Sequence, residues 1–178
     1  MNCIDYIKMQ KKYKYLLIDL DGTIINTISG SIFPKGIWDM KFDFNVLIAI
    51  KNCEFDEIFI LTNQGGVEEG YVDKEHWQNK AAYVCDCIKE YTNINCIYNV
   101  CYSTDKDNYR RKPNIGMVKE CISYLDKKII PISKNDFLIV GDASGLEGQF
   151  SDSDKKCAEN AGINYMDVKE FKKFNNEK

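Results

Sequence analysis

The sequence predicts an α/β fold with a doubly wound, mostly parallel sheet. Short apolar runs of strand length alternate along the chain with longer amphipathic segments of helix length. Several of these runs end in an acidic or hydroxyl residue, a pattern typical of buried parallel strands whose carboxyl ends carry a site. With 178 residues and 44% hydrophobic content, the chain can bury a core of its own.

The strands follow from the apolar runs, beginning with YLLID, which ends in a carboxylate. EIFILT, INCIYNVC and DFLIV follow the same pattern, and INYM is a weaker fifth run. The predicted strands are 15–19, 57–62, 94–101, 136–140 and 163–166. The predicted helices between them are 44–52, 73–91, 114–127 and 151–162, the last ending at Gly162 as a helix prefers. We expect residues 1–14 to be a short N-terminal extension and residues 15–178 to form a single domain.

Scarce residue types exclude several enzyme classes. His76 is the only histidine, so histidine-rich zinc sites and histidine-rich two-metal phosphatases cannot be built. The only arginines are Arg110 and Arg111. A cysteine phosphatase needs a thiolate six positions before an arginine, where this chain has Thr104 and Asp105.

The eight cysteines favour a reducing compartment over a disulfide framework. The N-terminal segment contains no apolar stretch of signal-peptide length, and the other apolar runs are too short to span a membrane. We therefore expect an intracellular protein, with nucleus and cytoplasm both open. No CxxC pair occurs, so buried small apolar side chains are favoured over the alternative of a structural zinc.

Polar residues follow the predicted strands at one edge of the sheet. They are Asp19, Asp21, Gly22 and Thr23 after the first strand, Thr62, Asn63 and Gln64 after the second, Gly141 and Asp142 after the fourth, and Arg110, Arg111, Lys112 and Pro113 before a helix. Carboxylates two residues apart, joined by a third across the sheet, suit a hard divalent cation, and Mg²⁺ is the natural choice. A hydroxyl, an ammonium group and a helix N-terminus would hold a phosphate. With no cysteine or histidine nucleophile available, an aspartate or water must attack phosphorus.

DLDGTI resembles the first motif of the haloacid dehalogenase superfamily, and ILTNQ, RKP and IVGD stand where its other motifs would be. The resemblance implies a Rossmann-like core, here without a large cap domain. It implies that Asp19 is the nucleophile, that Asp21 is general acid and then base, and that Thr62 and Lys112 grip the phosphoryl oxygens. Magnesium would be held by Asp19, Asp142 and the backbone carbonyl of Asp21. Asp154 would orient Lys112 or a metal-bound water, although it and Asp152 could also cap a helix.

The segment after the first motif is similar to the phosphatase domain of the polynucleotide kinase 3′-phosphatase family. The shared features are Thr27, Ser29-Gly30, Phe33-Pro34 and Trp38, followed by TNQGGVEEG, YRRKPNIGM, ISKND, IVGDASG and FSDSDKKCAENAGI. The likeness covers roughly residues 13–174. It implies removal of 3′-phosphates from DNA ends in strand-break repair, with RNA ends left open as substrates.

The resemblance assigns substrate-binding roles at the same edge of the sheet. We expect Thr23, Asn63 and Arg111 to contact substrate there, and Phe33 and Trp38 to stack on terminal bases, with packing of this segment against the core as the alternative. Two departures stand out. No GxxxxGK[ST] motif occurs, so we expect no kinase activity, and GDASG lacks the arginine and insertion of the family pattern. Protein partners are not indicated.

Two other functions compete with this one. A phosphatase for histidinol phosphate or heptose bisphosphate shares TNQ and RKP, but the heptose enzymes commonly carry a cysteine and histidine zinc loop ahead of RKP. Here the loop holds Cys101 alone and no histidine. A non-catalytic binding scaffold would predict a broken nucleophile or acid, whereas both are present. The formal charge of −3 becomes +2 without the five acids of the site region, so acidity does not exclude a nucleic-acid end.

Overall fold

The computed structural model describes residues 12–128, 131–149 and 151–175 and contains a five-stranded parallel sheet. The strand order is β5-β4-β1-β6-β7. The strands are β1 (Tyr15–Ile18), β4 (Glu57–Asn63), β5 (Cys96–Cys101), β6 (Phe137–Gly141) and β7 (Asn164–Asp167). These strands confirm the predicted doubly wound α/β fold. Residues 1–11, which make up most of the predicted N-terminal extension, lie outside the described residues.

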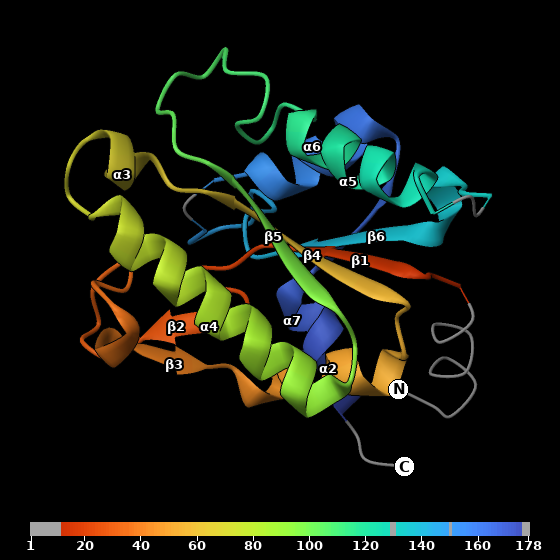
Figure 1. Ribbon diagram of the computed structural model, residues 1–178, viewed down its shortest axis with the longest axis horizontal. Coiled ribbons are helices and arrows are strands. Elements are labelled where there is room, and N and C mark those ends of the chain that lie inside the picture. Colours follow the sequence, from red (N-terminus) through yellow and green to blue (C-terminus); the bar gives the residue numbers. More distant parts are fainter. Residues whose placement is uncertain (1–11, 129–130, 150, 176–178) are drawn as a thin grey trace.

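Helices cover both faces of the sheet (Figure 1). They are α2 (Phe44–Cys53), α3 (Gly65–Glu68), α4 (Lys74–Thr92), α5 (Gly116–Asp126), α6 (Ser153–Ala161) and α7 (Val168–Phe171), with short 3-10 turns η1 (Ile37–Asp39), η2 (Lys134–Asp136) and η3 (Lys172–Asn175). In β1, Leu16 and Ile18 pack in the core with α2, α4 and α7. Tyr15 and Leu17 point to the opposite core, with α5 and α6. Central strands buried on both faces require the nearly continuous apolar runs seen in the sequence.

The four long helices agree with the predicted ones to within two residues at each end, and their boundaries have local causes. Asp43 and Asp73 accept hydrogen bonds from the backbone N–H groups of Asn45 and His76, which caps α2 and α4. Gly162 adopts a positive φ of 66° after α6 and accommodates the turn that ends this helix.

A small antiparallel hairpin, which the sequence pattern did not predict as strands, lies beyond the carboxyl end of β1. It pairs β2 (Ile25–Thr27) with β3 (Met40–Phe42), and we call residues 25–42 the flap. Its loop is organised by Asp39, whose side chain accepts hydrogen bonds from the Ser29 N–H (2.8 Å), the Ser29 hydroxyl (2.9 Å) and the Lys35 N–H (3.1 Å). This buried carboxylate gives the loop a defined shape.

No large cap domain is inserted in the described part of the chain. Between β1 and β4 the chain forms only the flap and α2, and between β4 and Lys112 it forms α3, α4, β5 and a loop. In the described residues, the carboxyl edge of the sheet is therefore bordered by the flap and loops and not by a second domain.

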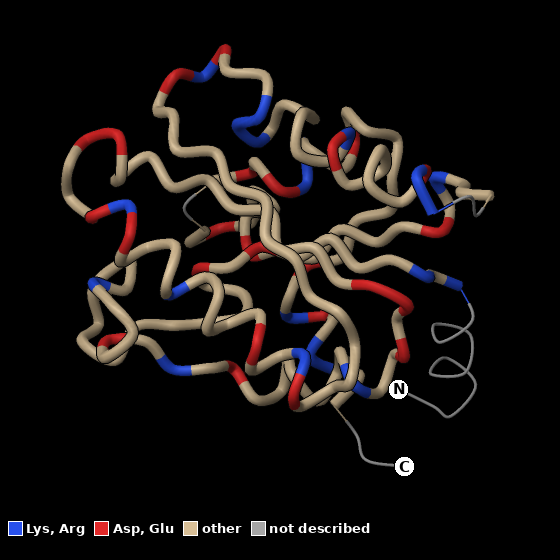
Figure 2. The backbone as a smooth tube through the Cα atoms, viewed as in Figure 1, with Lys and Arg blue, Asp and Glu red and all other residues tan. Residues whose placement is uncertain are grey.

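The cysteines support the prediction of buried small side chains. Cys53, Cys85, Cys101, Cys121 and Cys157 are buried, and all seven cysteines in the described ranges are unpaired. No described helix has the length and apolar character needed to cross a membrane. Figure 2 shows Lys and Arg interspersed with Asp and Glu around the traced backbone.

Candidate active site

The site lies at the carboxyl ends of three adjacent strands. Asp19 directly follows β1, and its N–H donates to the Val140 carbonyl of β6 (2.9 Å). Thr62 is near the end of β4, on the other side of β1, and Asp142 follows β6. The parallel order β4-β1-β6 thus brings three sequence-distant segments to one edge, as the sequence predicted.

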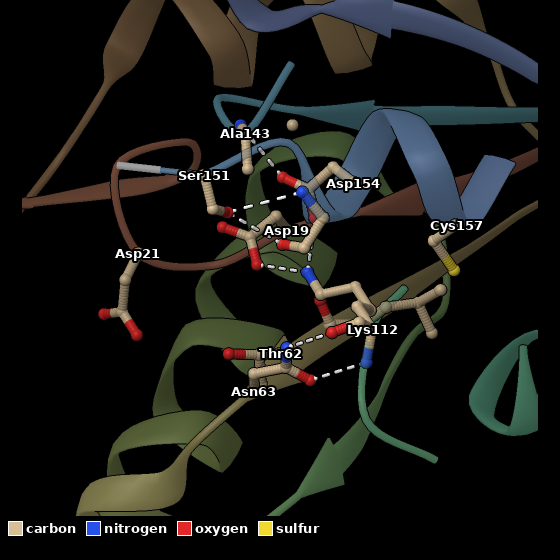
Figure 3. A network of polar contacts seen from close by, with 12 residues as sticks. Asp19, Asp21, Thr62, Asn63, Lys112, Ala143, Ser151, Asp154 and Cys157 are labelled. Carbon is tan, nitrogen blue, oxygen red and sulfur yellow. Dashed lines mark hydrogen bonds and ion pairs between the residues drawn. The ribbon is translucent and has the colours of Figure 1, made fainter. Parts of the chain in front are cut away.

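Lys112 is the centre of the polar network (Figure 3). Its ammonium group donates to Asp19 Oδ1 (2.6 Å), Asp154 Oδ1 (2.7 Å) and the Leu61 carbonyl (2.6 Å). Its backbone is held by the Asn63 amide, which both donates to the Lys112 carbonyl (3.0 Å) and accepts from the Lys112 N–H (2.9 Å). All three ammonium protons therefore have acceptors, although the lysine is only 5% exposed.

The charges of this network shift the pKa values of its members. Burial opposes the charge on Lys112, but the carboxylates of Asp154 and Asp19 outweigh it and raise the lysine pKa. Burial raises the pKa of Asp19 well above its usual value despite the opposing lysine. Burial, followed by repulsion from Asp154, raises the pKa of Asp142 to about 6. One lysine therefore does not balance this set of carboxylates.

A divalent cation fits the same carboxylates. Asp19, Asp142 and Asp154 each offer an oxygen, and these oxygens lie within 4.8 Å of one another. An all-oxygen, negatively charged donor set suits Mg²⁺ or another hard cation. Burial first, and then repulsion from Asp154, raise the pKa values of Asp19 and Asp142, and a bound cation would favour the charged form of both groups.

Two glycines make room for the carboxylates. A Cβ atom at Gly22 would lie 2.2 Å from Asp142 Oδ2, and Gly22 has a φ of +83°. A Cβ atom at Gly141 would lie 2.1 Å from Asp154 Oδ2. Any side chain at either position would push a carboxylate out of the cluster.

Asp21 belongs to a second, adjoining network. Its Oδ2 accepts from the Gln64 side-chain amide (2.6 Å), which also donates to the Thr62 hydroxyl (2.8 Å). Its Oδ1 has no hydrogen-bond partner, and the Lys80 ammonium group of α4 lies 3.6 Å away. In Figure 3 the Asp21 side chain is turned away from Asp19.

The remaining residues that were predicted to bind substrate differ in their burial and in their contacts. Thr23 is fully buried, with a hydroxyl that has no partner, so its position does not support a direct contact with substrate. Asn63 holds the backbone of Lys112 instead of facing outward. Arg111 donates to the Ser103 carbonyl (2.7 Å) and braces the loop before Lys112. Phe33 and Trp38 are more than half exposed on the flap.

The two acids on and before α6 have different surroundings. Asp154 is 1% exposed, binds Lys112, and accepts from the Ala143 N–H (3.1 Å) through its second oxygen. Asp152 makes no capping hydrogen bond and pairs with Lys156 at 2.6 Å on the surface. Only Asp154 is therefore part of the site.

The sequence analysis gave no role to Gln64 and did not identify Lys80. Lys80 shares a helix face with the buried residues Trp77, Ala81 and Val84. A lysine at a position where the helical pattern predicts a buried apolar residue is the feature of the sequence that could have identified Lys80.

Comparisons with known proteins agree with this geometry. A family model described as polynucleotide kinase 3 phosphatase matches residues 14–171. An uncharacterized 20.8 kDa protein of Autographa californica nuclear polyhedrosis virus is 30% identical over 169 residues, covering 90% of this chain and 86% of that protein. The bifunctional polynucleotide phosphatase/kinase of Schizosaccharomyces pombe is 28% identical over 169 residues, covering 93% of this chain but 39% of that protein.

Phosphatases for a small molecule are also among the relatives. A probable D-glycero-D-manno-heptose-1,7-bisphosphate 7-phosphatase of Thermoplasma volcanium is 29% identical over 140 residues, covering 78% of this chain and 91% of that protein. The structure of a D,D-heptose 1,7-bisphosphate phosphatase from B. bronchiseptica, complexed with magnesium and phosphate, aligns with a TM-score of 0.62 at 18% identity. That alignment covers 85% of this chain and 78% of the other and shows a common fold.

We expect Gly22→Ala to weaken Mg²⁺ binding and to lower the thermal stability. The new methyl group would collide with Asp142, and a non-glycine residue at this positive φ costs roughly 1–2 kcal/mol. The matched control is Gly70→Ala, because Gly70 has a φ of +76° and open space around its would-be Cβ atom. Calorimetric Mg²⁺ titration and thermal melts of both variants test this. Equal Mg²⁺ affinity in the two variants would contradict the crowding argument.

Proposed function

We propose that this chain, which belongs to the polynucleotide kinase 3 phosphatase family, hydrolyses the terminal 3′-phosphate of a polynucleotide. The observation that carries the proposal is the Lys112 contact with Asp19 within the site of a chain matched by that family over residues 14–171. The product would be the 3′-hydroxyl end that polymerases and ligases use, so DNA strand-break repair is the role we infer. DNA ends are the proposed partner, and RNA ends are a second polynucleotide to be compared.

Asp19 would act as the nucleophile. Its Oδ1 is engaged by Lys112, so Oδ2 is the oxygen that attacks phosphorus. The new Oδ2–P bond forms as the bond from phosphorus to the 3′ oxygen breaks, which gives an aspartyl-phosphate. Asp21 donates its proton to the departing 3′ oxygen, then takes a proton from the water that hydrolyses the aspartyl-phosphate.

Thr62 would donate to a phosphoryl oxygen during both steps, and the charge of Lys112 would stabilise the phosphoryl group from beside Asp19. Lys112 carries a positive charge in a buried position, where charge stabilisation is stronger than in water. Asp19, Asp142 and the backbone carbonyl of Asp21 would hold Mg²⁺, which supplies further neutralisation of phosphate charge. Asp154 also accepts a hydrogen bond from the Lys112 ammonium group and helps to fix it.

The lack of a cap domain and the flap support a polymer end as substrate. The described part of the chain inserts no second domain between β1 and Lys112 that would enclose the end of a strand. The flap exposes large apolar side chains, at Ile28, Ile32, Phe33, Ile37 and Trp38. Its loop is held in shape by Asp39, so these side chains are presented on a preformed surface that unpaired bases could stack on.

A small phosphorylated sugar is the second candidate substrate. The Thermoplasma volcanium relative, named a probable heptose bisphosphate phosphatase, matches 78% of this chain at 29% identity. Against it, the loop before Lys112 offers Cys101 without a histidine. The described ranges also contain no cap domain that would enclose a small substrate.

We expect a 3′-phosphorylated oligonucleotide to be hydrolysed with Mg²⁺ at a higher kcat/KM than histidinol phosphate or heptose bisphosphate. Phosphate release from the three substrates, alone and in competition, measures the preference. Asp19→Asn should abolish all activity while the circular-dichroism spectrum and melting temperature show a folded protein. Faster turnover of either small phosphate would overturn the substrate assignment, and an active Asp19→Asn variant would overturn the nucleophile.

We expect Trp38→Ala to lower kcat/KM for the oligonucleotide by roughly tenfold, because stacking of one base contributes about 1–3 kcal/mol. Hydrolysis of p-nitrophenyl phosphate should be unchanged, and Trp38→Phe should retain most of the oligonucleotide activity. Tyr91→Ala, at the far end of α4, provides the matched loss of an exposed aromatic ring. An equal loss on both substrates would mean that Trp38 supports the fold and not the strand.

We expect Mg²⁺ affinity to fall by about tenfold per pH unit below about pH 6, because Asp142 must lose its proton before the cation binds. The direction of this pH dependence follows from the raised pKa of Asp142, which keeps the carboxyl group protonated to a higher pH in the folded state than in the unfolded state. The same shift lowers the stability of the metal-free protein as the pH rises through that value, and Mg²⁺ should restore it. Calorimetry over about pH 5 to 7 measures the affinity, and a pH-independent affinity would exclude Asp142 as a ligand.

A further inference from the structure

Lys80 is a buried cation that the proposed mechanism does not use. It lies in α4 and is 4% exposed, on the helix face that also carries Trp77, Ala81 and Val84. An apolar residue is the usual occupant of such a position. Burying an ammonium group costs free energy unless an opposite charge lies nearby. The residue that provides this opposite charge therefore indicates the role of Lys80.

The partner is Asp21. The Lys80 ammonium group lies 3.6 Å from Asp21 Oδ1, at ion-pair distance but beyond a strong hydrogen bond. That oxygen is buried and accepts no hydrogen bond, whereas Oδ2 accepts from Gln64 at 2.6 Å. Asp21 is thus held at both oxygens, by the hydrogen bond to Oδ2 and by the charge of Lys80 near Oδ1.

Gln64 connects this arrangement to the phosphate-binding side of the site. Its amide donates to Asp21 and also to the Thr62 hydroxyl at 2.8 Å. Asp21 therefore has one contact from the end of β4 and one from α4. A carboxylate with two rotatable bonds needs both to keep one orientation.

We propose that Lys80 is a positioning residue that holds the Asp21 carboxyl group in the orientation needed for proton exchange with the leaving oxygen and then with water. The proposal rests on the proposed acid and base role of Asp21. The Asp21 carboxyl group gives its proton to the departing 3′ oxygen and regains one from the attacking water. Lys80 neither gains nor loses a proton, and it acts only through the orientation of the carboxyl group.

The test uses two substrates that differ in their need for an acid. The leaving group of a 3′-phosphorylated oligonucleotide is the 3′ alkoxide, which must be protonated. The leaving group of p-nitrophenyl phosphate is p-nitrophenolate, which departs without protonation. Single-turnover release of each leaving group isolates the first chemical step. Lys80→Met should slow this step about 10- to 100-fold for the oligonucleotide and little for p-nitrophenyl phosphate.

Four further measurements separate positioning from a structural role. Lys80→Arg should recover most of the rate, since it restores a cation near Asp21. Lys80→Met leaves the buried Asp21 Oδ1 without its opposite charge and should melt at a lower temperature, so the rates are compared at a temperature where circular dichroism shows a folded protein. Lys89→Met, on an exposed position of the same helix, should behave as wild type. The double variant Asp21→Asn, Lys80→Met should be no slower than Asp21→Asn alone.

The outcomes distinguish the two proposals. A normal rate for Asp21→Asn on the oligonucleotide would overturn the acid role of Asp21. A slow Asp21→Asn with a normal Lys80→Met would overturn only the role of Lys80. Equal losses on both substrates, or additive losses in the double variant, would show that Lys80 acts independently of Asp21 and would also overturn it.

Discussion

The crowding of three carboxylates at one edge of the sheet is the constraint on which this structure depends. The parallel sheet brings Asp19 and Asp142 to this edge, and α6 adds Asp154. Lys112 offsets part of this charge by contacting two of the three acids. Burial, followed by repulsion from Asp154, still raises the pKa of Asp142 to about 6. This excess of negative charge would destabilise an ordinary core, but here it favours the binding of a cation. The bound cation would in turn favour the binding of a phosphate.

The fold keeps these charges together through backbone features. Gly22 and Gly141 admit carboxylate oxygens into space that a Cβ atom would fill. Asn63 uses both ends of its amide to fix the backbone of Lys112 from the end of β4. Residues without a catalytic role therefore determine where the charged groups lie, which is why the motifs extend beyond the charged residues themselves.

The sequence was sufficient for the parts of the molecule that follow from strong periodicity. The apolar runs predicted the strands, and the order of parallel strands then placed Asp19, Thr62 and Asp142 together. The flap strands contain three residues each, too few for an alternation pattern to be recognised. Thr23 was expected to face substrate, but the turn after β1 points it into the core, an orientation that residue type alone does not determine. Lys80 was missed because its partner is distant in sequence.

The distribution of charge explains how an acidic protein can be suited to a nucleic-acid end. Basic and acidic residues are interspersed along the traced backbone of the described part of the chain (Figure 2). Long duplex would therefore be held weakly, because nonspecific affinity comes from many phosphate contacts. Two buried lysines instead place positive charge at the site, Lys112 beside the proposed nucleophile and Lys80 beside the proposed acid. Recognition in such a site depends on one terminal phosphate and on the proton delivered to its leaving group, so selectivity would arise at the chemical step more than in binding.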